Sequence, residues 1–367
     1  MLSEVFKYFF KLGFIAFGGP AAHVAMMQDD LVEKKKWMST EEFLDYLGTT
    51  NLIPGPNSTE MTMHCGYHRA GTLGLFVAGL SFIIPAASLT LVVAIIFEKY
   101  GDISWMIPIV NGIKAAVISF IFGAILKLGK KAVKDSFLAV IGLIVIVMCL
   151  LGFSEILMIL SAGLLVMLAR ATLMKNQLNS LIILPLFGIF TSGFTHMKMF
   201  LIFLKIGAIL FGSGYVLFAY LDGEFISNLG WLTHPDLVEA VAIGQVTPGP
   251  VLSTATFIGY KLGGFYGAAL ATLGIFLPSF IYVWILQNFI EKMRKSVPLK
   301  NFLSGVNVAA VAAMVAVSIE MTRSIVIDWK TGLICAISFF VYFYFKGINA
   351  LWIILGGGVA GFLLSFF

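Results

Sequence analysis

Two Pro-Gly-Pro elements lie 194 positions apart, and hydroxyl-bearing side chains follow each of them. Proline removes a backbone donor and forces the preceding residue out of the helical region, so a helix has to begin anew after each element. The first turn of such a helix offers free N–H groups and the positive end of its dipole, which together bind anions. The residues that we expect to bind an oxygen-rich anion here are Pro54, Gly55, Pro56, Asn57, Ser58, Thr59, Pro248, Gly249, Pro250, Ser253 and Thr254. Simple capping of the helix N-terminus by the Ser and Thr side chains is the alternative.

Two glycine-rich elements, at residues 17–20 and 211–214, interrupt apolar segments upstream of the Pro-Gly-Pro elements. Because glycine has no side chain, a ligand can approach the backbone closely there. We therefore add Gly18, Gly19, Gly212 and Ser213 to the predicted anion site. A kink that serves only helix packing is the alternative, and four interruptions in two matched pairs weigh against it.

Lys11 and Lys205 occupy equivalent positions about two turns before the glycine-rich elements. A charge buried in a membrane costs roughly 2.5–3.5 kcal/mol on insertion scales, so each lysine needs a reason to be there. They would either neutralise a doubly negative ligand or extend their ammonium groups to the membrane interface. Lys114, which lies within the apolar segment 105–127, is a third candidate cation.

Glu60 follows Pro56 by about one turn, and its counterpart in the second half is Thr254. Burial beside an anion would make this carboxyl a proton carrier that couples proton movement to substrate movement. The alternative is a carboxylate that stabilises a helix N-terminus. The other acids that recur in both halves are expected at solvated membrane edges, and they are Asp30, Glu224, Asp45 and Glu239.

His64 and His68 are four residues apart, which places both on one face of a helix as in some metal sites. No Glu follows His64 in the His-Glu-x-x-His manner and no third ligand stands out, so we predict no metal. The sequence also lacks a nucleotide-binding Gly-Lys-Ser/Thr loop, and we predict neither a cofactor nor ATP hydrolysis. We expect no enzyme activity, although an intramembrane enzyme built on Glu60, His64 and Cys65 is an alternative of a different class.

The composition places these elements in a membrane protein. Hydrophobic residues make up 59% of the chain and charged residues 12%, about half the share usual in soluble domains. With this composition, the lipid bilayer is an expected partner. The net charge of +5 is that expected from lysines in cytoplasmic loops, so it does not indicate binding to nucleic acid. Segments long enough to approach the thickness of the hydrocarbon core are 72–97, 105–127, 137–151, 155–173, 178–195, 266–287, 302–321, 329–345 and 350–367.

The two halves of the chain repeat each other. Residues that recur 194 positions later include Lys11, Phe17, Trp37 and Pro54, and residues that recur at an offset of 193 include Gly66, Pro85 and Gly112. Chance does not maintain so long a register, which indicates a tandem duplication. We predict an N-terminal repeat over residues 1–177, an unpaired linker span over 178–198 and a C-terminal repeat over 199–367.

Loop charges predict that the two repeats are inverted relative to each other. Three lysines precede Trp37, whereas the loop around Trp231 has no Lys or Arg, and the next pair of loops shows the reverse bias. Equivalent loops therefore lie on opposite sides of the membrane, with the N-terminus cytoplasmic and the C-terminus outside. The predicted fold is an all-α polytopic membrane protein, an inverted-topology tandem repeat with broken or re-entrant helices at the Gly-Gly-Pro and Pro-Gly-Pro elements. This architecture is typical of secondary transporters, which bind substrate near the midplane between the repeats.

These motifs, in this order, resemble those of the chromate ion transporter family in its long-chain, two-domain form. The motifs are Phe17-Gly18-Gly19-Pro20, the lysines before Trp37, Pro54-Gly55-Pro56, Gly66-Tyr67, Arg69-Ala70-Gly71, Phe211-Gly212 and Thr247-Pro248-Gly249-Pro250. The resemblance covers nearly the whole chain and implies multi-pass transport of chromate across a bacterial inner (plasma) membrane, usually as efflux, with sulfate as the similar anion.

The second half departs from the first, because Gly-Ser-Gly replaces Gly-Gly-Pro and Val251-Leu252 replaces Asn57-Ser58. The two half-sites should therefore contribute unequally. A transporter of sulfate or another tetrahedral oxyanion and a passive anion channel are alternatives. The coupling ion, and a homodimer as a partner, are open at this point.

Overall fold

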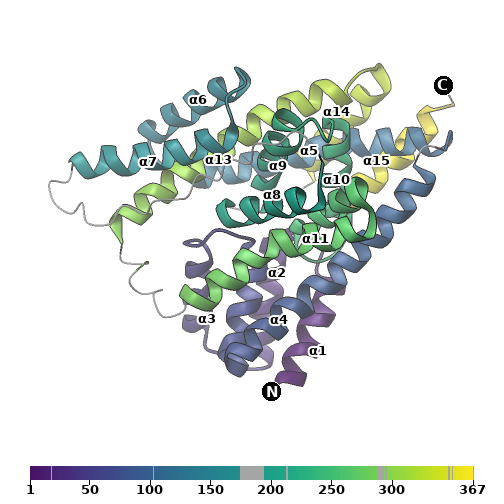
Figure 1. The fold of residues 1–367 in the computed structure, drawn as a ribbon. Coiled ribbons are helices and arrows are strands. Elements are labelled where there is room, and N and C mark those ends of the chain that lie inside the picture. The colour runs from purple at the N-terminus through teal and green to yellow at the C-terminus, as the bar shows by residue number, and fades with distance from the viewer. Residues whose placement is uncertain are drawn as a thin grey trace.

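The computed structural model describes residues 1–17, 19–101, 103–173, 194–211, 214–286, 293, 296–345, 348 and 350–366. Helices make up nearly all of its regular structure, and these residues contain no strand (Figure 1). The elements are α1 (Leu2–Ile15), α2 (Gly19–Met27), η1 (Gln28–Lys34), α3 (Thr40–Thr50), α4 (Asn57–Tyr100), α5 (Met106–Ala132), α6 (Ser136–Leu150), α7 (Glu155–Leu173), α8 (His196–Ile209), η2 (Gly214–Val216), α9 (Leu217–Leu221), η3 (Asp222–Asn228), α10 (His234–Val246), η4 (Val251–Ser253), α11 (Thr254–Leu286), α13 (Val297–Ile325), α14 (Trp329–Tyr344) and α15 (Ala350–Leu364). Most of the linker span predicted at 178–198 lies outside the described residues.

Four helical segments are long and apolar enough to cross a membrane: α4, α5, η4 continued by α11, and α13. They confirm the prediction of an all-α membrane protein. Three other predicted spans form the apolar helices α6, α14 and α15, which have 15, 16 and 15 residues. Each is shorter than the roughly 20 residues that a perpendicular crossing of the hydrocarbon core requires.

The helix α4 is folded back on itself. Ala70 and Gly71 leave the helical region, and Gly71 has a φ of 63° that favours glycine. A side-chain carbon on Gly66 would overlap the carbonyl oxygen of Gly74, so the two backbones touch. In a straight helix these residues would be about 12 Å apart along the axis. Residues 57–69 and 72–100 therefore form a helical hairpin, whose long arm contains the predicted span 72–97.

The helix α11 has the same hairpin shape. Its turn lies at Gly263 and Gly264, where Gly264 has a φ of 61°. Gly259 packs against the backbone of Gly267, as the equivalent glycines of α4 do. Each half of the chain thus has a short helix that rises from a Pro-Gly-Pro element and a long helix that returns beside it.

Gaps between helices coincide with the four elements rich in glycine and proline. They separate α1 from α2, α3 from α4, α8 from η2, and α10 from η4. Gly55 and Gly249, at the centres of the Pro-Gly-Pro elements, have φ angles of 141° and 90° that a residue with a side chain rarely adopts. Of the residues predicted to bind an anion, Gly18, Gly212 and Ser213 lie outside the described residues.

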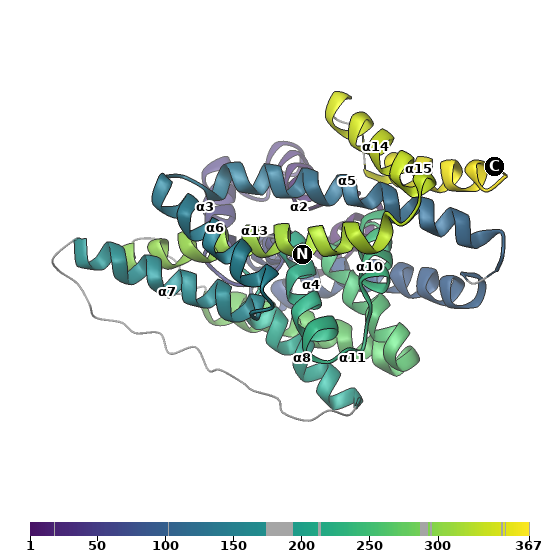
Figure 2. The same ribbon diagram turned by 90° about the horizontal axis from the view of Figure 1, so that it is seen from above.

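The last two helices of each half pack against the other half. Helix α5 packs against α14 and α15, and α13 packs against α6 and α7 (Figures 1 and 2). Small residues allow these close approaches: Gly112 meets Gly357, and its counterpart Gly305 meets Gly163. The long helices of α4 and α11 also pack on each other. The two halves are therefore interlocked rather than stacked side by side.

We predict that the glycine contact inside the α4 hairpin is required for stability. Replacing Gly66 with alanine places a methyl group against the carbonyl of Gly74, and overpacking of this kind costs about 1–3 kcal/mol. The matched control is Gly48→Ala, because no atom lies within 4 Å of a side-chain carbon added at Gly48. Thermal unfolding of both variants in detergent should show a lower midpoint for Gly66→Ala alone. Equal midpoints would contradict the hairpin.

Candidate functional site

Two reciprocal backbone hydrogen bonds join the interruptions of the two halves. The N–H of Gly55 donates to the carbonyl of Leu210 at 2.7 Å, and the N–H of Gly249 donates to the carbonyl of Ala16 at 2.9 Å. The two donors are equivalent in the repeat, because Gly249 lies 194 positions after Gly55. The two acceptors are equivalent as well, because Leu210 lies 194 positions after Ala16. Each Pro-Gly-Pro element is thus fixed to the glycine-rich element of the opposite half.

Further contacts bring the four interruptions into one region. A side-chain carbon on Gly19 would overlap the hydroxyl of Tyr215, which directly follows the second glycine-rich element. One on Gly214 would touch Val251 and Leu252, directly behind the second Pro-Gly-Pro element. The helix starts that the sequence predicts as anion sites therefore lie around a common centre.

Hydroxyl groups at these helix starts are buried without protein partners. Ser58 and Thr59 in the first turn of α4, and Ser253 before α11, expose at most 1% of their surface. Among the described residues, their hydroxyl oxygens have no hydrogen-bond partner. The Thr254 hydroxyl instead donates to the carbonyl of Val251 at 2.7 Å. Buried polar groups are nearly always hydrogen-bonded, so three hydroxyls here are available to a polar ligand.

Glu60 lies in the same region and is completely buried. Its carboxylate and the hydroxyl of Ser279 from α11 both lie against Gly55, where a side-chain carbon would overlap them. Neither carboxylate oxygen of Glu60 forms a hydrogen bond to another described residue. A carboxyl group from one half and a hydroxyl from the other thus face the first Pro-Gly-Pro element.

The second Pro-Gly-Pro element is much less polar. Gly249 faces Ala86, which is the counterpart of Ser279. The counterpart of Glu60 is Thr254, whose hydroxyl is already bonded. The two half-sites are therefore chemically unequal. Sequence reasoning missed Ser279, although the matched prolines Pro85 and Pro278 just before these two positions offered a signal.

The lysines predicted to neutralise an anion lie in different surroundings. Lys205 forms an ion pair with Glu224 at 2.7 Å, where only 9% of the glutamate side chain is exposed. Lys11 is exposed and lines a polar pocket with Asp30 and Lys35. The charge of Lys205 is thus matched by the protein itself, and a role for either lysine toward an anion stays a prediction.

The expectation that Glu224 and Glu239 are solvated is wrong. Both are buried, with 7% and 9% of their surface exposed. Glu239 of α10 forms ion pairs with Lys114 of α5 at 2.5 Å and Lys261 of α11 at 3.1 Å. Cations from distant parts of the chain compensate the cost of burying these carboxylates, which their local sequence does not reveal.

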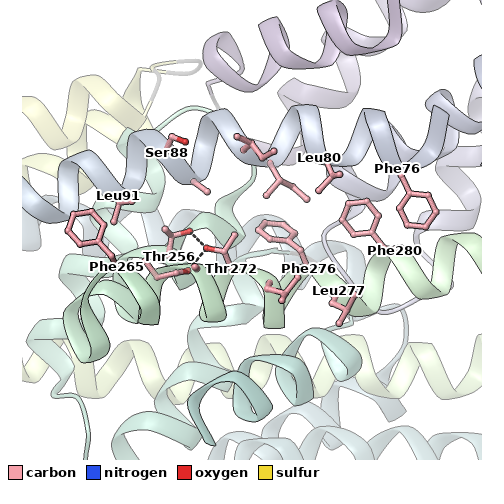
Figure 3. Close-up of a pocket in the computed structure, with 16 residues that line it drawn as sticks. Phe76, Leu80, Ser88, Leu91, Thr256, Phe265, Thr272, Phe276, Leu277 and Phe280 are labelled. Atoms are coloured by element: carbon pink, nitrogen blue, oxygen red, sulfur yellow. Dashed lines mark hydrogen bonds between the residues drawn. The ribbon is translucent and has the colours of Figure 1, made fainter. Parts of the chain in front are cut away.

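The described residues also line two further pockets besides the one that contains Lys11. A groove of about 460 Å³ between α4 and α11 is lined by apolar side chains and three hydroxyls, with Phe76 beside Phe280 at one end and Leu91 beside Phe265 at the other (Figure 3). It suits hydrocarbon rather than an anion. A second pocket of about 270 Å³ contains Glu155, Asp222, His234 and Glu320. Here the Asp222 carboxylate, 3.1 Å from His234, raises the pKa of that histidine.

Comparison with known proteins identifies related sequences. A family model described as Chromate transporter matches residues 3–167 and 197–362. The chain is 34% identical to a probable chromate transport protein of Synechococcus elongatus, over 92% of this chain and 89% of that protein. It is 30% identical to a chromate transport protein of Cupriavidus metallidurans (98% and 92% covered) and 28% identical to one of Pseudomonas aeruginosa (98% and 92% covered). No solved structure matches the chain.

We predict that Lys205 and Glu224 stabilise the fold as a pair. Lys205→Gln leaves a buried carboxylate without its cation and should lower the free energy of unfolding by about 1–3 kcal/mol, moderated by the partial exposure of the lysine. The double variant Lys205→Gln/Glu224→Gln should recover most of that loss. Thermal unfolding of the two single variants and the double variant measures the coupling. An increase in stability on Lys205→Gln alone would show instead that the lysine charge is uncompensated.

Proposed function

Because this chain belongs to the chromate transporter family, we propose that it is a secondary transporter that binds chromate at the buried helix starts between its two repeats. The repeats are residues 1–177 and 199–367, and the membrane is the bacterial inner membrane. Chromate transport follows from the family and the chromate transport proteins that the chain resembles. The binding site and the direction of transport are inferred from the residues.

The observation that carries the binding site is the set of buried hydroxyls without partners at Ser58, Thr59 and Ser253. A tetrahedral oxyanion is a pure acceptor, and its oxygens would take hydrogen bonds from these hydroxyls and from the free N–H groups of the first helical turns. The positive ends of the helix dipoles favour its negative charge. Hydroxyls that only capped their own helices would be hydrogen-bonded to backbone N–H groups of the first turn, and these three are not bonded to any described residue.

Glu60 gives this site a route to proton coupling. A deprotonated carboxylate beside a doubly negative anion would be repelled in a region of low dielectric constant. The carboxyl group therefore holds a proton while the anion is bound, and loses it when the anion leaves. Glu60 lies against Gly55 of its own half and beside Ser279 of the other half, which supports an exchange of this proton where the two repeats meet.

The membrane potential favours outward movement of the substrate. A doubly negative ion leaving a cell at −100 mV gains about 4.6 kcal/mol. Efflux therefore requires no coupled ion as a driving force and can carry a proton with the anion, whereas uptake of the same anion requires a coupled ion. We infer efflux as the physiological direction, with the protonation of Glu60 setting its dependence on pH.

An inverted arrangement of the repeats fits several contacts. The long helix of α4 runs antiparallel to that of α11, as the pairing of Phe76 with Phe280 and of Leu91 with Phe265 indicates (Figure 3). The reciprocal hydrogen bonds of Gly55 and Gly249 are those expected of a twofold relation between the halves. Relative motion of the two repeats would then expose the site to each side in turn.

Chromate flux into proteoliposomes tests the function. We expect saturable flux that responds to imposed voltage and is reduced by sulfate as a competitor. Ser58→Ala and Thr59→Ala should each raise the half-saturating chromate concentration about 5–30-fold, the equivalent of about 1–2 kcal/mol for a lost hydrogen bond to a charged ligand. Ser161→Ala is the matched control, because the exposed Ser161 hydroxyl donates only to the Met158 carbonyl. Flux that rises linearly without saturation would indicate a channel instead.

Accessibility of equivalent loops tests the inverted arrangement. Lys34 and Asn228 lie 194 positions apart and are both exposed, while the native Cys65, Cys149 and Cys335 are buried. In intact spheroplasts, a membrane-impermeant maleimide should label Asn228→Cys and leave Lys34→Cys unlabelled. Labelling of both after permeabilisation is the control. Labelling of both positions before permeabilisation, or of Lys34→Cys alone, would contradict the proposed topology.

A further inference from the structure

Three titratable side chains form a stripe along the short helix of the α4 hairpin. Glu60, His64 and His68 are spaced four residues apart, so they share one face and successive members are about 6 Å apart along the helix axis. Their burial decreases in order: Glu60 and His64 expose 0% and 1% of their surface, and His68 is partly exposed. The stripe therefore leads from the Pro-Gly-Pro element to the turn at Ala70 and Gly71.

Tyr46 of α3 covers both histidines. Its ring stacks on that of His64, with centroids 5.1 Å apart and planes at 20°, and contacts the ring of His68 edge-on at 6.0 Å. The Tyr46 hydroxyl lies 3.4 Å from Nδ1 of His68. Tyr46 therefore contacts both histidines, because its hydroxyl lies near His68 and its ring stacks on His64.

The elements packed around the stripe supply few other titratable groups. Helix α3 carries Glu42 and Asp45, both exposed near the outer end. On α1, the Tyr8 hydroxyl is 3.4 Å from Asp30, and Glu4 pairs with Arg69. Cys65 and His23 are buried beside the hairpin, where His23 bonds to the Ala16 carbonyl and stacks against Phe82. At the inner end α11 contributes the Ser279 hydroxyl, which does not titrate near neutral pH.

The second repeat lacks this stripe. The counterpart of Glu60 is Thr254, and the positions that correspond to His64 are the apolar Phe257 and Ile258. The position of His68 is taken by Lys261, which pairs with Asp236 and Glu239. Among the described residues of the two equivalent short helices, the titratable stripe is therefore present in the first repeat and absent from the second.

We propose that Glu60, His64 and His68 form a proton path from the membrane face that bears Lys34–Lys36 to the carboxyl group beside the anion site. The path rests on the proposed coupling role of Glu60. A proton from water binds one ring nitrogen of His68 while the other nitrogen gives up its proton toward His64. His64 repeats this exchange toward Glu60, and a water molecule or a ring rotation spans each gap of about 6 Å. When the site opens to the opposite face, Glu60 gives its proton to water there as the anion leaves, so that one proton crosses the membrane with each anion and no other reactant is consumed.

The test measures chromate flux and proton flux together in proteoliposomes that contain a pH-sensitive dye. In His64→Gln, the half-saturating chromate concentration should stay within about twofold of wild type, because the glutamine lies one turn away from the bound anion. Chromate-dependent proton flux should fall at least tenfold, and the pH profile of chromate flux should flatten. The control is His196→Gln, a histidine at the start of α8 whose Nε2 lies 3.3 Å from the Gly263 carbonyl oxygen.

Two milder variants keep the test decisive if His64→Gln does not fold. His68→Gln changes a partly exposed residue, and Tyr46→Phe removes only the hydroxyl near His68. Each should slow proton flux about 3–10-fold while leaving chromate saturation unchanged. Proton flux equal to wild type in these folded variants, or saturable chromate flux without proton movement in the wild type, would overturn the path alone. Absence of saturable chromate flux in the wild type would overturn the proposed function and the path with it.

Discussion

The reciprocal hydrogen bonds of Gly55 and Gly249 are the constraint on which the rest of the structure depends. Helices that end inside an apolar environment leave backbone groups unsatisfied, and each such group is costly. Here the N–H at the centre of one interruption is satisfied by the carbonyl that ends a helix of the opposite half. Neither half can therefore form its interruptions at low cost without the other. The same bonds place four sets of helix ends, and their dipoles, in one region.

The duplicated framework carries an unequal site. Matched glycines and prolines shape both halves, since these residues determine backbone geometry, which both halves need. The residues that line the centre differ: Glu60 and Ser279 face one Pro-Gly-Pro element, while Thr254 and Ala86 occupy the corresponding positions at the other. The backbone framework is thus repeated in the two halves, whereas the side chains that face the two Pro-Gly-Pro elements differ in polarity.

Much of the backbone could be predicted from the sequence because it depends on glycine and proline. The positions of the gaps between helices follow from these residue types, whereas the hairpin turns at Gly71 and Gly264 were not predicted. The partners of charged and polar side chains could not be predicted, because they come from distant segments: Lys114 compensates Glu239, and Ser279 reaches Gly55 from another helix. The span predicted over 350–367 extends beyond α15, which ends at Leu364, because aromatic residues continue the apolar composition after Ser365.

The exchange of helices between halves has a consequence for biosynthesis. Helix α5 packs against α14 and α15, which are the last described helices of the chain. A nascent chain emerges from the ribosome N-terminal end first, so the glycine-lined face of α5 enters the lipid well before its partners are made. The insertion machinery or the surrounding lipid has to occupy that face in the meantime. These contacts are therefore completed only after α14 and α15 have been synthesised, and a product without these helices would retain an uncovered helix surface for quality-control proteases to recognise.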